Sequence, residues 1–170
     1  MVLRGRPVLL DTNAVLEAWR IGAWKAVAGG HLLETVEMVV TETQTGFQRR
    51  RREQQVDLAD LRRGLKAVHA PGLAERARLA IEVSDIALDP GERDLWAHAM
   101  ARPDAWLLCG PDKASLRVGV RLGFRERLVS LEALADEVGL RLKDRLRENF
   151  TSRWLGATLS AMVVAEKGTP

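Results

Sequence analysis

The sequence is short of several features, and each shortage excludes a class of protein. It has one cysteine, Cys109, among 170 residues, so it can form neither an intrachain disulfide framework nor a zinc site of several cysteines. It has no apolar run near the roughly 20 residues of a transmembrane helix. The apolar stretch at the N-terminus is too short for a signal peptide and soon meets an acidic residue. We therefore expect a cytoplasmic protein with no membrane partner.

A large excess of one charge is also missing. The sequence has 26 basic and 23 acidic residues, a net charge of +3, which does not by itself indicate a nucleic-acid partner. Hydrophobic residues make up 46% of the chain and charged residues 29%, enough for a core and a polar surface. This length suits one compact domain. We expect the domain to span residues 1–139, with a helical extension at 140–170 packed on it.

Short apolar runs alternate with helical patterns along the chain. Four runs have the length and composition of strands buried on both faces of a parallel sheet, and a weaker fifth lies at 81–87. This alternation predicts an α/β protein: a three-layer α/β/α fold with a central parallel sheet of four to five strands and an extra C-terminal helix at about 140–165. The predicted strands are 7–10, 36–40, 105–109 and 127–131, and the predicted helices are 14–28, 43–55, 58–68, 73–80, 90–101, 113–122 and 131–138.

Four acidic residues fall where function gathers in an open α/β sheet, at the carboxyl ends of the strands. Asp11, Glu42 and Asp112 each follow a predicted strand. Glu92 lies in the first turn of the predicted helix 90–101, which precedes the predicted strand 105–109. Carboxylates that converge repel one another unless a cation neutralises them, and hard oxygen ligands select Mg²⁺ or Mn²⁺. The pattern therefore predicts a magnesium or manganese site.

Three of these acids also have a purely structural interpretation. Asp89 and Glu92 fit a capping box around Pro90, and Asp112 can cap the helix that follows it. Glu42 sits favourably in the first turn of a helix. Asp11 has no comparable structural explanation, because it follows a buried strand directly. Asp11 is therefore the strongest functional candidate of the four.

Three segments together resemble the PIN domain family. They read VLLDTNAVLEAW, LDPGERDLWAHAM and AWLLCGPDKASLRVGVRLGF, and the resemblance spans roughly residues 7 to 135 in the family's order. It implies a metal-dependent ribonuclease. The best-known members are VapC-type toxin ribonucleases, so the resemblance also implies an antitoxin protein as a possible partner.

The resemblance assigns roles to individual residues. Asp11, Glu92 and Asp112 match three metal-binding acids of the family's site, with Thr12 and Asn13 as polar support and Asp94 as a weaker supporting candidate. The family usually carries a further Glu five or six residues after the second strand, inside the next helix. No acid lies between residues 43 and 47. Either Glu42 turns into the site as a fourth catalytic acid, or the site has three.

An active site of this kind needs no protein nucleophile. A metal-bound hydroxide attacks the phosphorus in line, and the metal offsets the charge that builds on the phosphoryl oxygens. The resemblance implies 5′-phosphate and 3′-hydroxyl ends. The three histidines show no metal-ligand spacing. Basic residues near the predicted strand ends are candidates for contact with RNA phosphates. They are Arg49, Arg50, Arg52, Lys113 and Arg117.

Two other functions compete with the nuclease. The first is a catalytically weak PIN-like module that binds RNA or protein, which a missing helix acid would favour. The second is a phosphohydrolase of another α/β family with Asp11 as nucleophile, but Asn13 stands where such a site would place a second Asp. The small residues of the C-terminal helix also favour close contact with a second copy of the chain or with another protein.

Overall fold

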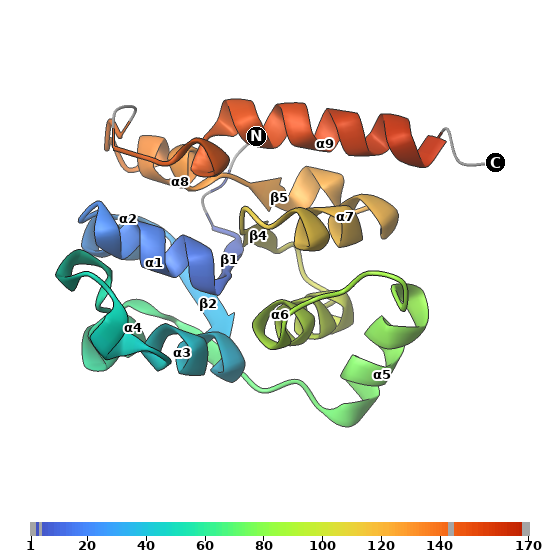
Figure 1. The fold of residues 1–170 in the computed structure, drawn as a ribbon, viewed down its shortest axis with the longest axis horizontal. Helices are drawn as coiled ribbons and strands as arrows, with labels where there is room; N and C mark the ends of the chain where they lie inside the picture. Colours follow the sequence, from blue (N-terminus) through green and yellow to red (C-terminus); the bar gives the residue numbers. More distant parts are fainter. Residues whose placement is uncertain (1–2, 4, 143–144, 168–170) are drawn as a thin grey trace.

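A five-stranded, all-parallel sheet forms the centre of the computed structural model, which describes residue 3, residues 5–142 and residues 145–167 (Figure 1). Helices cover both faces of the sheet, so the three-layer α/β/α fold predicted from the sequence is confirmed. The strand order is β3-β2-β1-β4-β5. The strands are β1 (Pro7–Leu10), β2 (Leu32–Val36), β3 (Ala67–His69), β4 (Leu107–Cys109) and β5 (Leu128–Val129).

The side chains of β1 alternate between two hydrophobic clusters, one on each face of the sheet. Val8 and Leu10 pack with α1, α2 and α8, whereas Leu9 packs with α5, α6, α7 and α9. No helix in the described part of the chain has the length and apolar character needed to cross a bilayer. The α-helices are α1 (Thr12–Arg20), α2 (Trp24–Gly30), α3 (Glu37–Gln44), α4 (Leu58–Gly64), α5 (Leu73–Glu82), α6 (Pro90–Ala101), α7 (Lys113–Arg121), α8 (Leu131–Glu137) and α9 (Ser152–Lys167).

The chain reverses its direction of travel across the sheet beside β1. From β1 it passes to β2 and β3, and then returns to β4 on the other side of β1. The carboxyl ends of β1 and β4 therefore flank a topological switch point, where α/β sheets bind ligands. Leu10 pairs with Cys109 in the register of these two strands. The residues that follow them, Asp11 and Gly110, lie at this point.

The second strand lies earlier in the chain than its predicted position at 36–40. The strand β2 ends at Val36, and the residues after it form α3. The error has a physical cause: Glu34 and Thr35 are polar but buried in the sheet, which hides the strand from a search for apolar runs. Val39 and Val40 are instead the buried side of α3.

Other boundaries also differ from the prediction. The helix predicted at 58–68 ends at Gly64, and the short edge strand β3 follows it. The weak strand candidate at 81–87 is wrong, because this segment holds the end of α5, where Ile81 is 80% exposed, and a loop. The predicted C-terminal helix begins only at Ser152, and residues 143–144 of its predicted range lie outside the described residues.

Two glycines divide helices that the sequence pattern joins. Gly22 has φ +71° and separates α1 from α2 within the predicted helix 14–28. Gly46 has φ +69° just after α3, so the predicted helix 43–55 becomes two 3₁₀ turns, η1 (Phe47–Arg49) and η2 (Arg52–Gln54). Positive φ is cheap for glycine alone, and glycine commonly ends helices in this conformation.

Candidate functional site

Asp11 is buried at the switch point and uses only one of its carboxylate oxygens. It follows β1 and caps α1, where its Oδ1 accepts a hydrogen bond of 2.6 Å from the backbone N–H of Ala14. The residue is 2% exposed, and its Oδ2 has no hydrogen-bond partner among the described residues. A buried, unpaired carboxylate oxygen is costly, so this atom requires a ligand or a proton.

Gly110 gives Asp11 the room that this position requires. A Cβ built on Gly110 would lie 2.5 Å from Oδ2 of Asp11 and 2.7 Å from its Cγ. Side-chain atoms do not approach so closely, and the cap on α1 prevents Asp11 from moving aside freely. A glycine after β4 therefore allows the carboxylate of Asp11 to stand between the two strand ends.

Glu42 is held at the same end of the sheet by two contacts. It lies in the last turn of α3, where its Oε2 accepts a hydrogen bond from the hydroxyl of Thr12. Its Oε1 accepts a hydrogen bond of 2.9 Å from the backbone N–H of Gly91 at the start of α6. A Cβ on Gly91 would lie 2.3 Å from Oε2 of Glu42. Residues of α1, α3 and α6 therefore meet around one carboxylate.

Glu92 forms the capping box that its sequence predicts. Its backbone N–H donates to Oδ1 of Asp89 at 2.7 Å, and its own Oε2 accepts from the N–H of Asp89 at 3.1 Å. Asp112 likewise caps α7, where its Oδ1 accepts from the N–H of Ala114 at 2.7 Å. The structural roles foreseen for both acids are therefore present. They occupy Oε2 of Glu92 and Oδ1 of Asp112.

The acids at this end of the sheet raise one another's affinity for protons. Burial raises the pKa of Asp11 to about 7, and the negative charges of Asp89, Asp112 and Glu42 add to this rise. Burial also raises the pKa of Glu92 to about 8, again with contributions from Asp112 and Asp89. Burial first, and then the neighbouring negative charges, disfavour the charged state of Asp11 and Glu92. A bound cation would relieve that repulsion.

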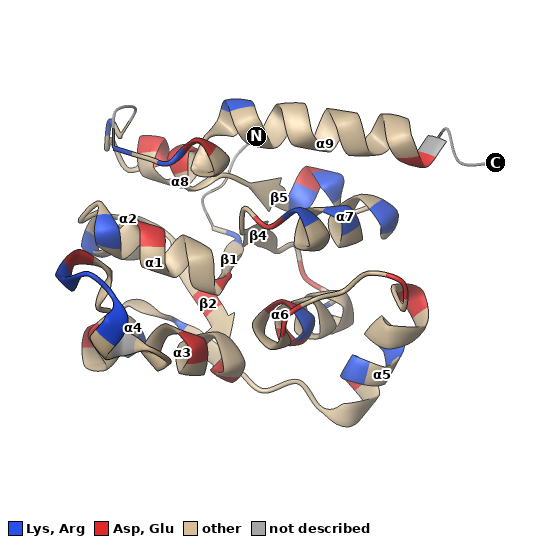
Figure 2. Ribbon diagram, in the orientation of Figure 1, with Lys and Arg blue, Asp and Glu red and all other residues tan. Residues whose placement is uncertain are grey.

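We call Asp11, Glu42, Glu92 and Asp112 the acid pocket. All its donors are carboxylate oxygens, which suits hard cations such as Mg²⁺ and Mn²⁺. It is placed by the ends of β1 and β4, by the beginnings of α1, α6 and α7, and by the last turn of α3. Figure 2 shows the acidic colouring near the ends of the central strands and the basic colouring along α7.

The supporting residues predicted from the sequence differ in their surroundings. Thr12 contacts the acid pocket through Glu42, whereas Asn13 is exposed on α1. Asp94 faces α5: it forms a two-pronged ion pair with Arg76, with both hydrogen bonds at 2.7 Å. The carboxylate of Asp94 therefore joins two helices, and this contact lies on another side of α6, as its spacing from Glu92 suggests.

The predicted RNA-binding residues also separate into two groups. Arg49 and Arg52 are exposed in the 3₁₀ turns after α3, and Lys113 and Arg117 are exposed on α7 beside Asp112. Arg50 is engaged within the protein, because its guanidinium donates to the backbone carbonyls of Glu42 and Thr43 at the end of α3. Arg50 is therefore a structural residue of the loop rather than a free cation.

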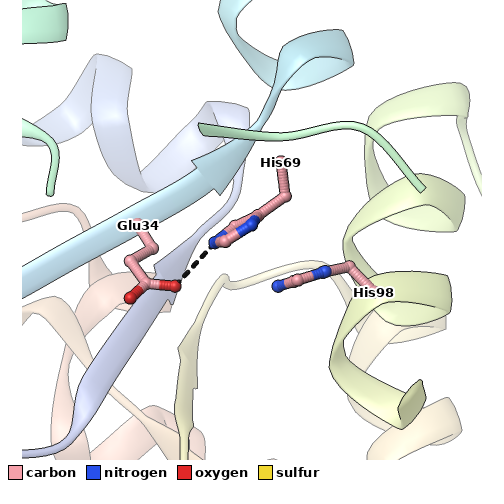
Figure 3. Close-up of side chains that lie close together, drawn as sticks. All are labelled: Glu34, His69 and His98. Carbon is pink, nitrogen blue, oxygen red and sulfur yellow. Dashed lines mark hydrogen bonds and ion pairs between the residues drawn. The ribbon is translucent and has the colours of Figure 1, made fainter. Parts of the chain in front are cut away.

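A second cluster lies outside the acid pocket and was missed from the sequence. Glu34 of β2, His69 of β3 and His98 of α6 each offer one ligand atom, and these atoms lie within 4.8 Å of one another (Figure 3). This group could hold a metal ion. Within the described part of the chain no other group of three acidic, His or Cys residues is gathered so tightly, so the acid pocket is more widely spaced.

Sequence spacing gives no sign of this cluster. Its members are 35 and 29 positions apart along the chain and come from three elements, so only the pairing of β2 with β3 and the packing of α6 bring them together. The one available signal was a Glu within the short segment Leu32–Val36, whose other residues are Leu, Thr and Val.

Comparison with known proteins returned no relative for this chain: no family model, no curated protein and no solved structure matches it. The geometry of the site therefore carries the functional argument.

Proposed function

We propose that this chain is a divalent-metal-dependent endoribonuclease that hydrolyses RNA phosphodiester bonds at the acid pocket. The observation that carries the proposal is the Oδ2 atom of Asp11. It is buried, has no hydrogen-bond partner among the described residues, and lies at the switch point of the sheet among other carboxylates. A structural cap would need one oxygen of this residue, not a second one left unsatisfied in a buried position.

Asp11, Glu92 and Asp112 are the residues we expect to hold Mg²⁺ or Mn²⁺. The metal, when bound, supplies a water of lowered pKa and offsets the charge on the phosphodiester. The chain's own groups fix the ligands in place: the N–H of Ala14 orients Asp11, and the first turn of α7 orients Asp112. Such preorganisation avoids the cost of arranging charged ligands during the reaction.

The true position of β2 bears on the role of Glu42. The resemblance to PIN domains leads us to expect an acid five or six residues after the second strand, inside the next helix. With β2 ending at Val36, Glu42 lies six residues later and inside α3. The apparent loss of the helix acid came from misplacing the strand, and this removes the main reason for preferring a weakened binding module.

RNA is the substrate that we propose for this pocket. Lys113 and Arg117 lie one turn apart on the helix that Asp112 caps, and both are exposed. Cations beside a metal-binding pocket suit a polyanionic backbone, which needs several phosphate contacts at once. An antitoxin partner, a homodimer and a cytoplasmic location stay predictions that follow from the sequence.

The test is cleavage of a mixed RNA pool with Mg²⁺ or Mn²⁺, with EDTA as the metal-free control. The decisive variant is Asp11→Asn, which keeps an oxygen that can cap α1 but removes the charge. The matched variant is Asp136→Asn, which removes an exposed acid from α8. We expect metal-dependent cleavage by the wild type and by Asp136→Asn, and loss of at least about a hundredfold in Asp11→Asn, comparable to removing a major catalytic group.

Two results would overturn this proposal. Equal cleavage by the wild type and by Asp11→Asn would place the activity elsewhere. Metal binding at the acid pocket with no cleavage of any RNA would instead support the binding module that competes with the nuclease.

A further inference from the structure

Glu34, His69 and His98, which we call the histidine cluster, lie on the sheet face covered by α6. Glu34 is 9% exposed and sits in β2 beside the edge strand β3. Nε2 of His69 lies 2.8 Å from Oε2 of Glu34. The two imidazole rings are stacked, with centroids 3.8 Å apart, and each turns one nitrogen towards the Glu34 carboxylate (Figure 3). Three elements therefore direct their donor atoms to one point.

This donor set differs in kind from the acid pocket. Two imidazole nitrogens and one carboxylate form a ligand set for Zn²⁺ and related transition metals, whereas Mg²⁺ prefers oxygen alone. Ligand atoms around a tetrahedral zinc lie about 3.4 Å apart, from metal–ligand distances near 2.1 Å. The cluster's upper limit of 4.8 Å is larger by a little over an ångström. Side-chain rotation can supply such a shift.

A cation already stands beside the cluster, in the form of Arg102. Its Nη1 donates to Oε2 of Glu34 and lies 3.5 Å from Nε2 of His98. Its other two nitrogens, Nε and Nη2, donate to the carboxylate of Asp104 at 2.8 and 2.7 Å. The guanidinium is rigid, so Nη1 can leave the cluster only if the whole group moves. The side chain of Asp104 is exposed and can move with it, which keeps the fork intact. The buried carboxylate of Glu34 needs a positive charge nearby, and Arg102 supplies it in the absence of a metal.

We propose that the histidine cluster is a second, transition-metal site, in which Zn²⁺ binds Glu34, His69 and His98 and displaces Nη1 of Arg102. The bound ion joins β2, the edge strand β3 and α6. Because β3 has only three residues and one neighbouring strand, this link stabilises a short edge of the sheet. The site is separate from the acid pocket and does not depend on the ribonuclease proposal.

The test is calorimetric titration of Zn²⁺ into the full chain that carries Asp11→Asn, after treatment with EDTA and its removal. This background weakens the acid pocket, so any remaining tight binding reports on the histidine cluster. We expect one tight site and a rise of the melting temperature with Zn²⁺. Adding His69→Gln should weaken binding at least about tenfold. The matched variant His31→Gln, which removes a histidine bonded to the carbonyl of Leu134, should leave binding unchanged.

Replacing Arg102 supplies the second arm. Arg102→Ala removes the competing cation and should tighten Zn²⁺ binding several-fold. Should His69→Gln fail to fold, His98→Gln gives the same information from α6. The proposal is overturned if the Asp11→Asn protein shows no tight Zn²⁺ site, or if the site persists in both histidine variants of the cluster. Unchanged affinity in Arg102→Ala would overturn the displacement of Arg102.

Discussion

A Cβ atom on Gly110 would stand 2.5 Å from Oδ2 of Asp11, the buried oxygen that has no hydrogen-bond partner in the described part of the chain. Residue 110 therefore sets how close the end of β4 comes to the carboxylate that follows β1. The present position of Oδ2 of Asp11 therefore depends on residue 110 being a glycine.

The first prediction is that Gly110→Ala weakens metal binding and cleavage together. The added methyl group would overlap the Asp11 carboxylate and must displace it. That displacement is costly, because the N–H of Ala14 holds the carboxylate in place through Oδ1. We expect cleavage to fall at least about tenfold, with metal affinity measured by calorimetry falling in parallel. The matched variant is Gly29→Ala on α2, where a Cβ meets nothing within 4 Å. It should keep full activity, and equal activity in both variants would contradict the prediction.

The second prediction concerns stability and pH. The pKa of Asp11 is raised from 3.8 to about 7 and that of Glu92 from 4.5 to about 8, so the folded chain holds protons that the unfolded chain has lost. The stability from these groups is complete at pH values below their unfolded pKa and is lost as the pH rises through about 7 to 8. In EDTA, the melting temperature should therefore fall between about pH 5 and pH 8 by roughly 5 °C or more.

Divalent metal should reverse this trend, because it binds the ionised carboxylates and replaces the lost protons. Thermal unfolding with excess Mn²⁺ checks this, and the stabilisation by metal should grow as the pH rises. The variant Asp11→Asn should lose much of both effects. A melting temperature in EDTA that rises over the same pH range would contradict the assignment.

The third prediction is that Thr12 positions Glu42. Its hydroxyl donates to Oε2 of Glu42, so Thr12→Val leaves the fold intact but frees one carboxylate oxygen. We expect kcat to fall about tenfold, a loss of about 1.4 kcal/mol in the transition state, with little change in KM. Thr12→Ser keeps the hydroxyl and should restore most of the rate. A change confined to KM would instead place Thr12 in substrate binding.

The fourth prediction separates Asp94 from the chemistry. Its carboxylate is 3% exposed and holds Arg76 of α5 with two hydrogen bonds. Asp94→Asn should lower the free energy of unfolding, because the two hydrogen bonds from Arg76 to the buried side chain lose their charged acceptor. Cleavage per folded molecule should not change. Denaturant unfolding and initial rates measured on the same preparation check both parts, and a loss of rate with normal stability would return Asp94 to the site.

The fifth prediction concerns the path of RNA. If Lys113 and Arg117 contact phosphates, the double variant Lys113→Gln/Arg117→Gln should weaken binding and lower the salt dependence. For single-stranded RNA, the slope of log affinity against log salt should fall by roughly 0.7 for each phosphate that the variant no longer neutralises. Lys25→Gln on α2, on the opposite face of the sheet, is the matched variant. An equal salt-dependence slope in the wild type and in the double variant would show that RNA does not contact α7.

The sequence predicts the fold where strands are continuously apolar. The strand at Pro7–Leu10 and the helix at Pro90–Ala101 have their predicted bounds, because one is an unbroken apolar run and the other carries Asp89 as N-cap and Pro90 at its first position. The position of β2 was predicted wrongly because Glu34 and Thr35 are polar. They are nevertheless buried, since Arg102 and the carbonyl of Leu10 supply their hydrogen bonds from other elements. Local patterns cannot register a polar residue whose partners arrive from distant segments.

This limit of local patterns explains why the sequence predicts the acid pocket but not the histidine cluster. Asp11 and Asp112 lie at strand ends where a helix begins, and Glu92 lies in the first turn of α6, so the geometry of a parallel sheet predicts their common end. Glu42 reaches the same end from the last turn of α3. Glu34 lies within a strand, and His98 lies within α6, two turns beyond its first residues. Their approach depends on how α6 packs across β2 and β3, which is a tertiary property.

The metal-binding role that we propose for Asp11 and Asp112 would join a second selective pressure to their role as helix caps. Each gives one oxygen to the backbone N–H groups that begin a helix, and the cap is part of what makes the chain fold. Replacement by alanine would therefore cost the cap as well as the charge, about 1 kcal/mol for each helix. A lineage that did not need the proposed chemistry would still gain from keeping these acids, so their presence in a sequence can outlast that activity.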